Sequence, residues 1–169
     1  MQTTPSIPFN ILVCGSRDFD HEEVVWSGLN AAKSMIETEH APHRLHTVWA
    51  ASHHFAGVSA AARRWCASED RGVVFQNFFF ELRQGTSDLN TTMADAEKDW
   101  GTITQAASFL REHHVRLVLA FPNPTGVLGI ASRNIHLFSK VARVPFIDFS
   151  DLLKRGSLHG SSESAVAAC

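Results

Sequence analysis

The sequence lacks an excess of positive charge. Lysine and arginine together number 15 against 17 aspartate and glutamate residues, which gives a formal net charge of −2 over 169 residues. Nucleic acids are held largely by cationic surfaces that neutralise their phosphates. The composition therefore argues against a nucleic-acid polymer as a partner.

Long apolar runs are also missing. No stretch approaches the roughly 18 consecutive apolar residues that a membrane span needs. The first ten residues, MQTTPSIPFN, lack the basic start and the apolar core of a secretory signal. We therefore expect a soluble, cytoplasmic protein without a membrane partner.

Cysteine is scarce. Cys14, Cys66 and Cys169 cannot all pair within one chain, and their spacing matches neither a disulfide framework nor a zinc ribbon. This pattern favours a reducing compartment. Cys14 ends an apolar run, where we expect a buried, inert thiol rather than a nucleophile.

Histidine is the residue type best suited to a metal here. His40, His43 and His46 recur every three residues and could offer nitrogen ligands. Pro42 interrupts this run, so one helical face cannot present all three. A polar connection between a helix and a strand is the simpler interpretation, and we expect no metal site.

The length and composition fit one compact domain. An apolar content of 44% over 169 residues is enough for one substantial core. The end of the chain, GSLHGSSESAVAAC, is rich in serine, glycine and alanine and has few large apolar groups to pack. We expect a single domain over residues 1–155 and a flexible tail over residues 156–169.

Strand-like and helix-like stretches alternate along this domain. Short apolar runs predict strands at 11–14, 45–51, 73–76, 116–121 and 144–149. Apolar residues at helical spacing predict helices with inner faces over 25–36, 58–65, 103–114 and 135–142, while 77–92 looks irregular. This alternation favours an α/β, Rossmann-like fold, an open and mostly parallel sheet flanked by helices on both faces.

The turn after the first strand can hold an anion. Gly15 lets the backbone approach a phosphate closely, Ser16 and the local amides can donate hydrogen bonds, and Arg17 can pair with an oxyanion. Asp18 could accept from a ribose hydroxyl. The alternative is a tight turn in which Arg17 and Asp18 pair with each other in solvent.

These residues also carry a resemblance. The segment ILVCGSRDFDHEEVVWSGL resembles the start of proteins in the SLOG superfamily, in its YspA and YpsA-like nucleotide-binding branch, whose first strand runs into a G-S-R-[DE] turn. Two later segments, VWAASHHFAGVSAAARRWC and RLVLAFPNPTGVLGIASRNIHLFSKVARVPFI, are similar to further family segments in the same order. The resemblance spans residues 9–149 and implies a nucleotide or ADP-ribose-like ligand, with no cofactor required.

The resemblance assigns ligand contacts residue by residue. His53 stands where the family has glycine, although its imidazole could itself meet a phosphate. Ser132 replaces a threonine as the hydroxyl donor and the expected N-cap of the last main helix. The ligand-binding residues implied in this way are Gly15, Ser16, Arg17, Asp18, His53, Gly57, Gly129, Ser132, Arg133 and Asn134.

One position bears on catalysis. Relatives of the LOG type that hydrolyse nucleoside monophosphates carry a glutamate in P-G-G-x-G-T-x-x-E, and the corresponding residue here is Ile135. An isoleucine cannot transfer a proton. We therefore expect sensing or sequestration of a nucleotide signal without turnover, and no catalytic residue.

Two alternatives stay open. A LOG-like phosphoribohydrolase or other nucleotide hydrolase would have to recruit another carboxylate, such as Asp18, Asp88 or Asp95. A protein-interaction module on a degenerate SLOG scaffold would bind no nucleotide.

Three consecutive phenylalanines suggest a contact surface. Residues 78–80 cannot all face inward from a strand, because alternate side chains point to opposite faces. At least one should meet another helix, a partner subunit or a ligand. SLOG relatives commonly self-associate, so we expect a homo-oligomer.

Overall fold

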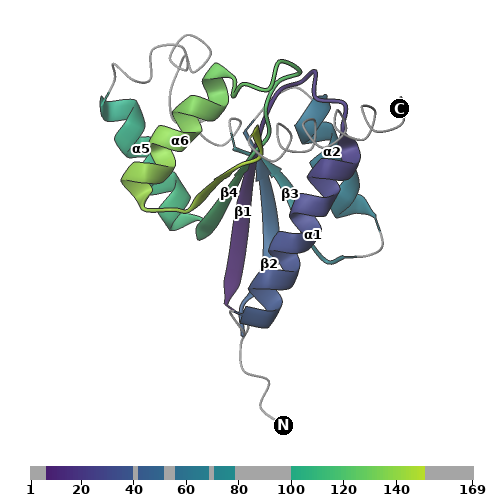
Figure 1. Ribbon diagram of the computed structural model, residues 1–169. Coiled ribbons are helices and arrows are strands. Elements are labelled where there is room, and N and C mark those ends of the chain that lie inside the picture. The colour runs from purple at the N-terminus through teal and green to yellow at the C-terminus, as the bar shows by residue number, and fades with distance from the viewer. Residues whose placement is uncertain (1–6, 40–41, 52–55, 69–70, 79–99, 151–169) are drawn as a thin grey trace, which may run out of the picture.

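The computed structural model describes residues 7–39, 42–51, 56–68, 71–78 and 100–150 (Figure 1). Residues 151–169 lie outside this range, so the division into a domain and a tail stays a prediction. In chain order the described elements are β1 (Pro8–Cys14), α1 (Glu22–Glu39), β2 (Arg44–Ala50), α2 (Gly57–Ala67), β3 (Val74–Asn77), α5 (Trp100–Glu112), β4 (Val115–Ala120), α6 (Ile130–Ala142) and β5 (Phe146–Asp148).

The strands form one sheet in the order β3-β2-β1-β4-β5, and all four described pairings are parallel. Helices α1 and α2 pack on one face, and α5 and α6 pack on the other (Figure 1). The expected Rossmann-like α/β fold is confirmed. The alternation of strands and helices was enough to predict it, because parallel neighbours need a crossover between them.

The central strand β1 is buried on both faces. Its side chains at Ile11 and Val13 join the core under α1 and α2, while Leu12 and Cys14 join the core under α5 and α6. A strand covered on both sides gains from apolar residues at every position. This explains why residues 11–14 form an unbroken apolar run.

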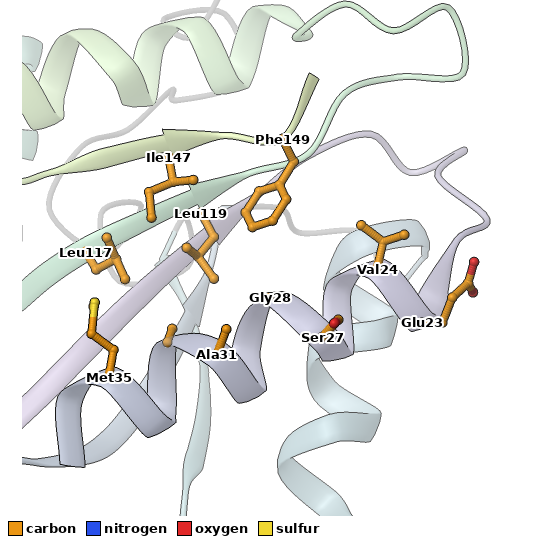
Figure 2. Close-up of a pocket in the computed structure, with 11 residues that line it drawn as sticks. Glu23, Val24, Ser27, Gly28, Ala31, Met35, Leu117, Leu119, Ile147 and Phe149 are labelled. Carbon is orange, nitrogen blue, oxygen red and sulfur yellow. The ribbon is translucent and has the colours of Figure 1, made fainter. Parts of the chain in front are cut away.

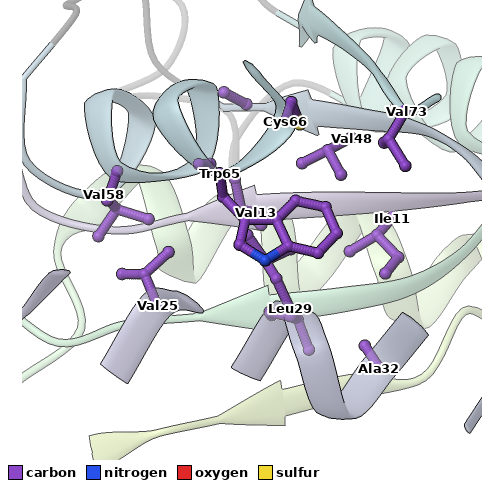
Figure 3. Close-up of a cluster of buried hydrophobic side chains, with 14 of the residues drawn as sticks. Ile11, Val13, Val25, Leu29, Ala32, Val48, Val58, Trp65, Cys66 and Val73 are labelled. Atoms are coloured by element: carbon purple, nitrogen blue, oxygen red, sulfur yellow. The ribbon is translucent and has the colours of Figure 1, made fainter. Parts of the chain in front are cut away.

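Helix α1 buries one stripe of its surface against the sheet. Val25, Leu29 and Ile36 are fully buried, and Trp65 of α2 closes the same core without any exposure (Figure 3). The indole Nε1 of Trp65 donates to Oδ1 of Asn30 at 2.9 Å, so its one polar atom is satisfied. Burying each large side chain contributes roughly 1.5–3 kcal/mol.

The helical spacing over residues 103–114 is right except at its end. Ile103 and Leu110 are buried, but His114 is exposed and has a φ of 51°. The N–H of His114 bonds to the carbonyl of Arg111, three residues back, in a tight turn. This turn takes His114 off the inner face, so its expected packing was wrong.

Two further findings bear on the expectations from sequence. Among the described residues, no helix combines the length and the apolar character needed to cross a membrane. Phe78 is fully buried, with its ring edge-on to Phe109 at 4.9 Å between centroids. The rest of the phenylalanine run, and most of the irregular segment predicted over 77–92, lie outside the described residues.

Candidate functional site

The direction of strand addition reverses beside β1. The chain passes from β1 through β2 to β3 on one side, and then returns to place β4 and β5 on the other. In open parallel sheets, ligands bind outside the carboxyl ends of the strands at such a reversal. The loops after β1 and β4 meet at this edge (Figure 1). They carry residues 15–18 and lead into residues 129–134.

The loop after β1 is held by its own polar groups. The backbone N–H of Asp18 donates to Oγ of Ser16 at 3.1 Å. Nε of Arg17 lies 3.6 Å from Oδ1 of Asp18, and these side chains are 67% and 69% exposed. The loop therefore has the alternative form expected from the sequence, in which Arg17 and Asp18 pair in solvent. Such an exposed pair adds little stability. Replacing Asp18 with an anion as the partner of Arg17 therefore costs little free energy.

Gly57, at the start of α2, packs against the loop that follows β1. Gly57 begins α2 with a φ of 54°, and a β-carbon there would lie 2.2 Å from the carbonyl oxygen of Ser16. The N–H of Val58 donates to that same oxygen at 3.3 Å. Gly15 is confined too, because its β-carbon would lie 2.5 Å from Cγ2 of Val58. Both glycines therefore allow the loop after β1 to rest on the start of α2.

The start of α6 differs from the expectation. The N-cap is Gly129, whose backbone is extended, and the N–H of Arg133 bonds to its carbonyl at 3.0 Å. Ser132 is therefore the third residue inside the helix, so its assignment as N-cap was wrong. Its side chain is buried and hydrogen-bonds with the Cys14 thiol.

The remaining residues of this junction divide between core and surface. Asn134 is buried and has polar contacts of its own, whereas Arg133 is exposed. Ile135 is fully buried in the core between the sheet and helices α5 and α6. A side chain at that position therefore packs into the core. His53 lies outside the described residues.

The N-terminus of α6 offers hydrogen-bond donors. The first turn of a helix leaves its N–H groups without intrahelical partners and carries partial positive charge. A β-carbon on Gly129 would meet nothing within 4 Å, so there is open space beside this end of α6. With exposed Arg133 in the same turn, the arrangement can receive an anion.

Cys14 is the last residue of β1, next to this edge of the sheet, and its side chain is buried. Burial raises the pKa of its thiol to about 12, a hydrogen bond with Ser132 lowers it, and the charge of Asp148 raises it. A thiol that stays protonated at neutral pH is a poor nucleophile. The expectation that Cys14 is buried is confirmed, and its low reactivity stays a prediction that the raised pKa supports.

An aromatic stack that sequence reasoning missed supports the loops. The Phe121 and Phe149 rings are stacked with centroids 4.6 Å apart, and Phe19 lies 5.7 Å from Phe121. Phe121 directly follows β4 and Phe149 directly follows β5. Two phenylalanines at equivalent strand ends were the available signal, because neighbouring parallel strands bring such positions together.

A separate groove of about 670 Å³ lies between α1 and strands β4 and β5 (Figure 2). It contains none of the ten predicted ligand-binding residues. Small-molecule sites combine an apolar wall with a few convergent polar groups, and here only Glu23 and Ser27 supply polar side chains. We therefore place the candidate site at the loop edge. The groove is lined by Glu23, Val24, Ser27, Gly28, Ala31, Ala32, Met35, Leu117, Leu119, Ile147 and Phe149.

The described histidines have local roles. Nδ1 of His46 lies 2.8 Å from Oγ1 of Thr47, and the ring of His43 meets Phe9 edge-on. Within the described parts of the chain, no three His, Cys, Asp or Glu side chains are placed to hold a metal ion.

No protein-family model matches the chain, and searches of curated proteins and of solved structures found no match either. The class established by the structure is an α/β protein with a parallel, Rossmann-like sheet. The similarity to the SLOG superfamily stays an interpretation of the sequence.

Proposed function

We propose that this protein binds a nucleotide or ADP-ribose-like molecule at the carboxyl edge of the sheet and releases it unchanged. Its role in that case is to sense or sequester a nucleotide signal. The observation that carries the proposal is the meeting of the loops after β1 and β4 at the reversal of strand order. The cytoplasmic location expected from the cysteine content belongs to the same proposal.

The structure divides the proposed residues into two groups. Arg17 and Arg133 are exposed, and together with the first-turn amides of α6 they are the groups that would contact phosphate. Gly15 and Gly57 act indirectly, by letting the loop after β1 pack on α2. Charge-assisted hydrogen bonds to phosphate are each worth roughly 1.5–3 kcal/mol, so a few of them support micromolar binding.

The proposal of binding without turnover is supported by Ile135. This residue stands where the hydrolytic relatives have glutamate, and its side chain is buried beneath α6. Asp18, a carboxylate that the sequence offered instead, is paired with Arg17 and two-thirds exposed. A carboxylate in an exposed ion pair is not held in a fixed position against a reacting bond.

The test is a melting and product assay on the full chain with separate nucleotides, ADP-ribose and cyclic nucleotides. A ligand at a hundred times its dissociation constant stabilises by about 2.7 kcal/mol. For a protein of this size that corresponds to a rise in Tm of roughly 5–10 °C. Chromatography of the same samples measures whether the ligand is consumed.

Each outcome separates the candidates. A raised Tm with intact ligand supports the proposal, and formation of free base or ribose phosphate supports the hydrolase. If Tm stays unchanged with every compound, the proposal is wrong and the protein-interaction module remains as the alternative. The matched variants are Arg133→Gln, which should lose the shift, and Lys140→Gln in the last turn of the same helix, which should keep it.

Self-association is also part of the proposal. Val74 of β3 and Ile147 of β5 are more than 40% exposed, and both strands are edges of the described sheet. Exposed edge strands present unpaired backbone groups that can pair with another chain. Sedimentation velocity should show a dimer or larger species, which Ile147→Lys dissociates. A monomer at all concentrations would contradict the proposal of self-association.

A further inference from the structure

A second concave site lies at the opposite edge of the sheet. In Figure 1, α5 and α6 both end beside the start of β4. A cavity of about 210 Å³ is present there, lined by Arg111, Val115, Arg116 and residues 142–145. No residue of the candidate nucleotide site lines it.

Three arginines reach this cavity from three different elements. Arg111 lies in the last turn of α5, Arg116 is the second residue of β4, and Arg143 directly follows α6. In the part of the chain that the structure describes, no acidic residue lines the cavity. Within the described residues, none of the three side chains takes part in an ion pair or a side-chain hydrogen bond. Three like charges therefore lie together, with no counter-charge among the described residues that line the cavity.

Helix capping does not account for these arginines. Basic side chains often lie at helix C-termini, where they bond to the last carbonyls. Here the N–H groups of His113 and His114 already bond to carbonyls in the last turn of α5, and those of Arg143 and Val144 do the same for α6. Arg116 lies on a strand. The guanidinium groups are thus available for a ligand.

We propose that this cavity binds a compact phosphate anion, either inorganic phosphate or diphosphate. Guanidinium groups are planar and always charged, and they pair with phosphate oxygens in a bidentate way. The volume is below the range of about 300–1,000 Å³ that suits whole drug-sized ligands. At about 30 Å³ for each water, it holds roughly seven waters, which suits a phosphate group without an attached nucleoside.

Calorimetric titration of the full chain with sodium diphosphate, and separately with sodium phosphate, tests this proposal. At low ionic strength both should bind, and added sodium chloride should weaken the binding by screening. Arg116→Gln should lower the affinity roughly tenfold or more. Arg143→Asn should do the same, because asparagine tolerates the left-handed backbone at that position (φ of 60°).

Two controls make the result specific. Lys140→Gln removes a charge from the last turn of α6, and Arg44→Gln removes one from the start of β2; neither residue lines the cavity. Both should bind diphosphate like the unaltered chain. An equal loss in Lys140→Gln would show attraction by surface charge alone and overturn the site. The proposal would also be overturned if the chain failed to bind diphosphate at millimolar concentration. It would be overturned as well if ADP bound more tightly than diphosphate and this binding depended on Arg116. Failure here leaves the nucleotide proposal untouched.

Discussion

The backbone of Gly57 packs so closely against the carbonyl oxygen of Ser16 that no side chain fits between them. A β-carbon on Gly57 would lie 2.2 Å from that oxygen and 2.6 Å from the carbonyl oxygen of Arg17. The backbone of Gly57 also has a left-handed φ of 54°. Two constraints therefore meet at one residue, and only a residue without a side chain satisfies both. The conformation of the loop after β1 depends on this contact.

Gly57→Ala should destabilise the fold and displace the loop that carries Arg17. The left-handed conformation alone costs roughly 1–2 kcal/mol for a residue with a β-carbon, and the contact with Ser16 adds to this. Urea denaturation measures the loss. Gly72→Ala is the control, because Gly72 has a φ of 66° but open space around its α-carbon. If the two variants lose equal stability, the contact with Ser16 does not contribute to the free energy of unfolding.

Arg17→Ala should separate binding from stability. The ion pair of Arg17 with Asp18 is exposed, so the free energy of unfolding should change by less than about 0.5 kcal/mol. Affinity for the nucleotide should fall roughly 10- to 100-fold if the guanidinium pairs with phosphate. Arg44→Ala, an exposed arginine at the start of β2, should leave affinity unchanged. Full affinity in Arg17→Ala would remove this contact from the site.

Much of the fold could be predicted because its signals are local and repeated. Val25, Leu29, Ala32 and Ile36 mark one face of α1, and all four are buried. Element ends were less predictable. His114 continues the helical spacing of α5, but backbone hydrogen bonds turn the chain before it. Spacing alone does not encode where those bonds close.

The candidate site was less predictable than the fold. The sequence indicated which loops meet, since strand ends share one edge in a parallel sheet. It did not indicate the N-cap of α6, because both glycine and serine are acceptable N-caps and the backbone at Gly129 decides between them. The groove beside Phe149 was missed as well. It depends on how β5 lies relative to α1, which no local pattern specifies.

Two cysteines should resist modification in the folded protein. Burial raises the pKa of both Cys14 and Cys66 to about 12. In a Cys169→Ser variant, which leaves these two thiols, a disulfide reagent at pH 8 should react slowly until denaturant is added. Rapid labelling of either thiol in the native protein would contradict the burial described here.

The same thiols make stability depend on alkaline pH. Their pKa is higher in the folded protein than the ordinary value of 9.0, so the folded state holds the protons more tightly. Their contribution to the free energy of unfolding is fully present below about pH 9. It is lost as the pH rises toward 12, by about 1.4 kcal/mol per pH unit for each thiol. The chain contains no tyrosine to add a titration in this range. Urea unfolding from pH 8 to 11 should show a shallower slope in the double variant Cys14→Ala/Cys66→Ala.

The side chain of Asn10 in β1 links β2 to the turn that precedes β4. Its Oδ1 accepts from the backbone N–H of Thr47 at 3.0 Å, and its Nδ2 donates to the carbonyl of His113. The register of β1 shifts beside Asn10 in both of its pairings, with β2 and with β4. The amide side chain therefore replaces backbone hydrogen bonds that the shift interrupts.

Asn10→Ala should destabilise the protein by about 1–3 kcal/mol, because it removes the partner of the buried Thr47 N–H and of the partly buried His113 carbonyl. Hydrogen exchange gives the sharper readout, since the Thr47 amide should lose its protection. Thr38→Ala is the matched control. It also removes a side-chain hydrogen bond to backbone, at 2.7 Å, but on the exposed face of α1, where water replaces the lost partner. An unchanged exchange rate at Thr47 in Asn10→Ala would mean that Asn10 does not hold the register.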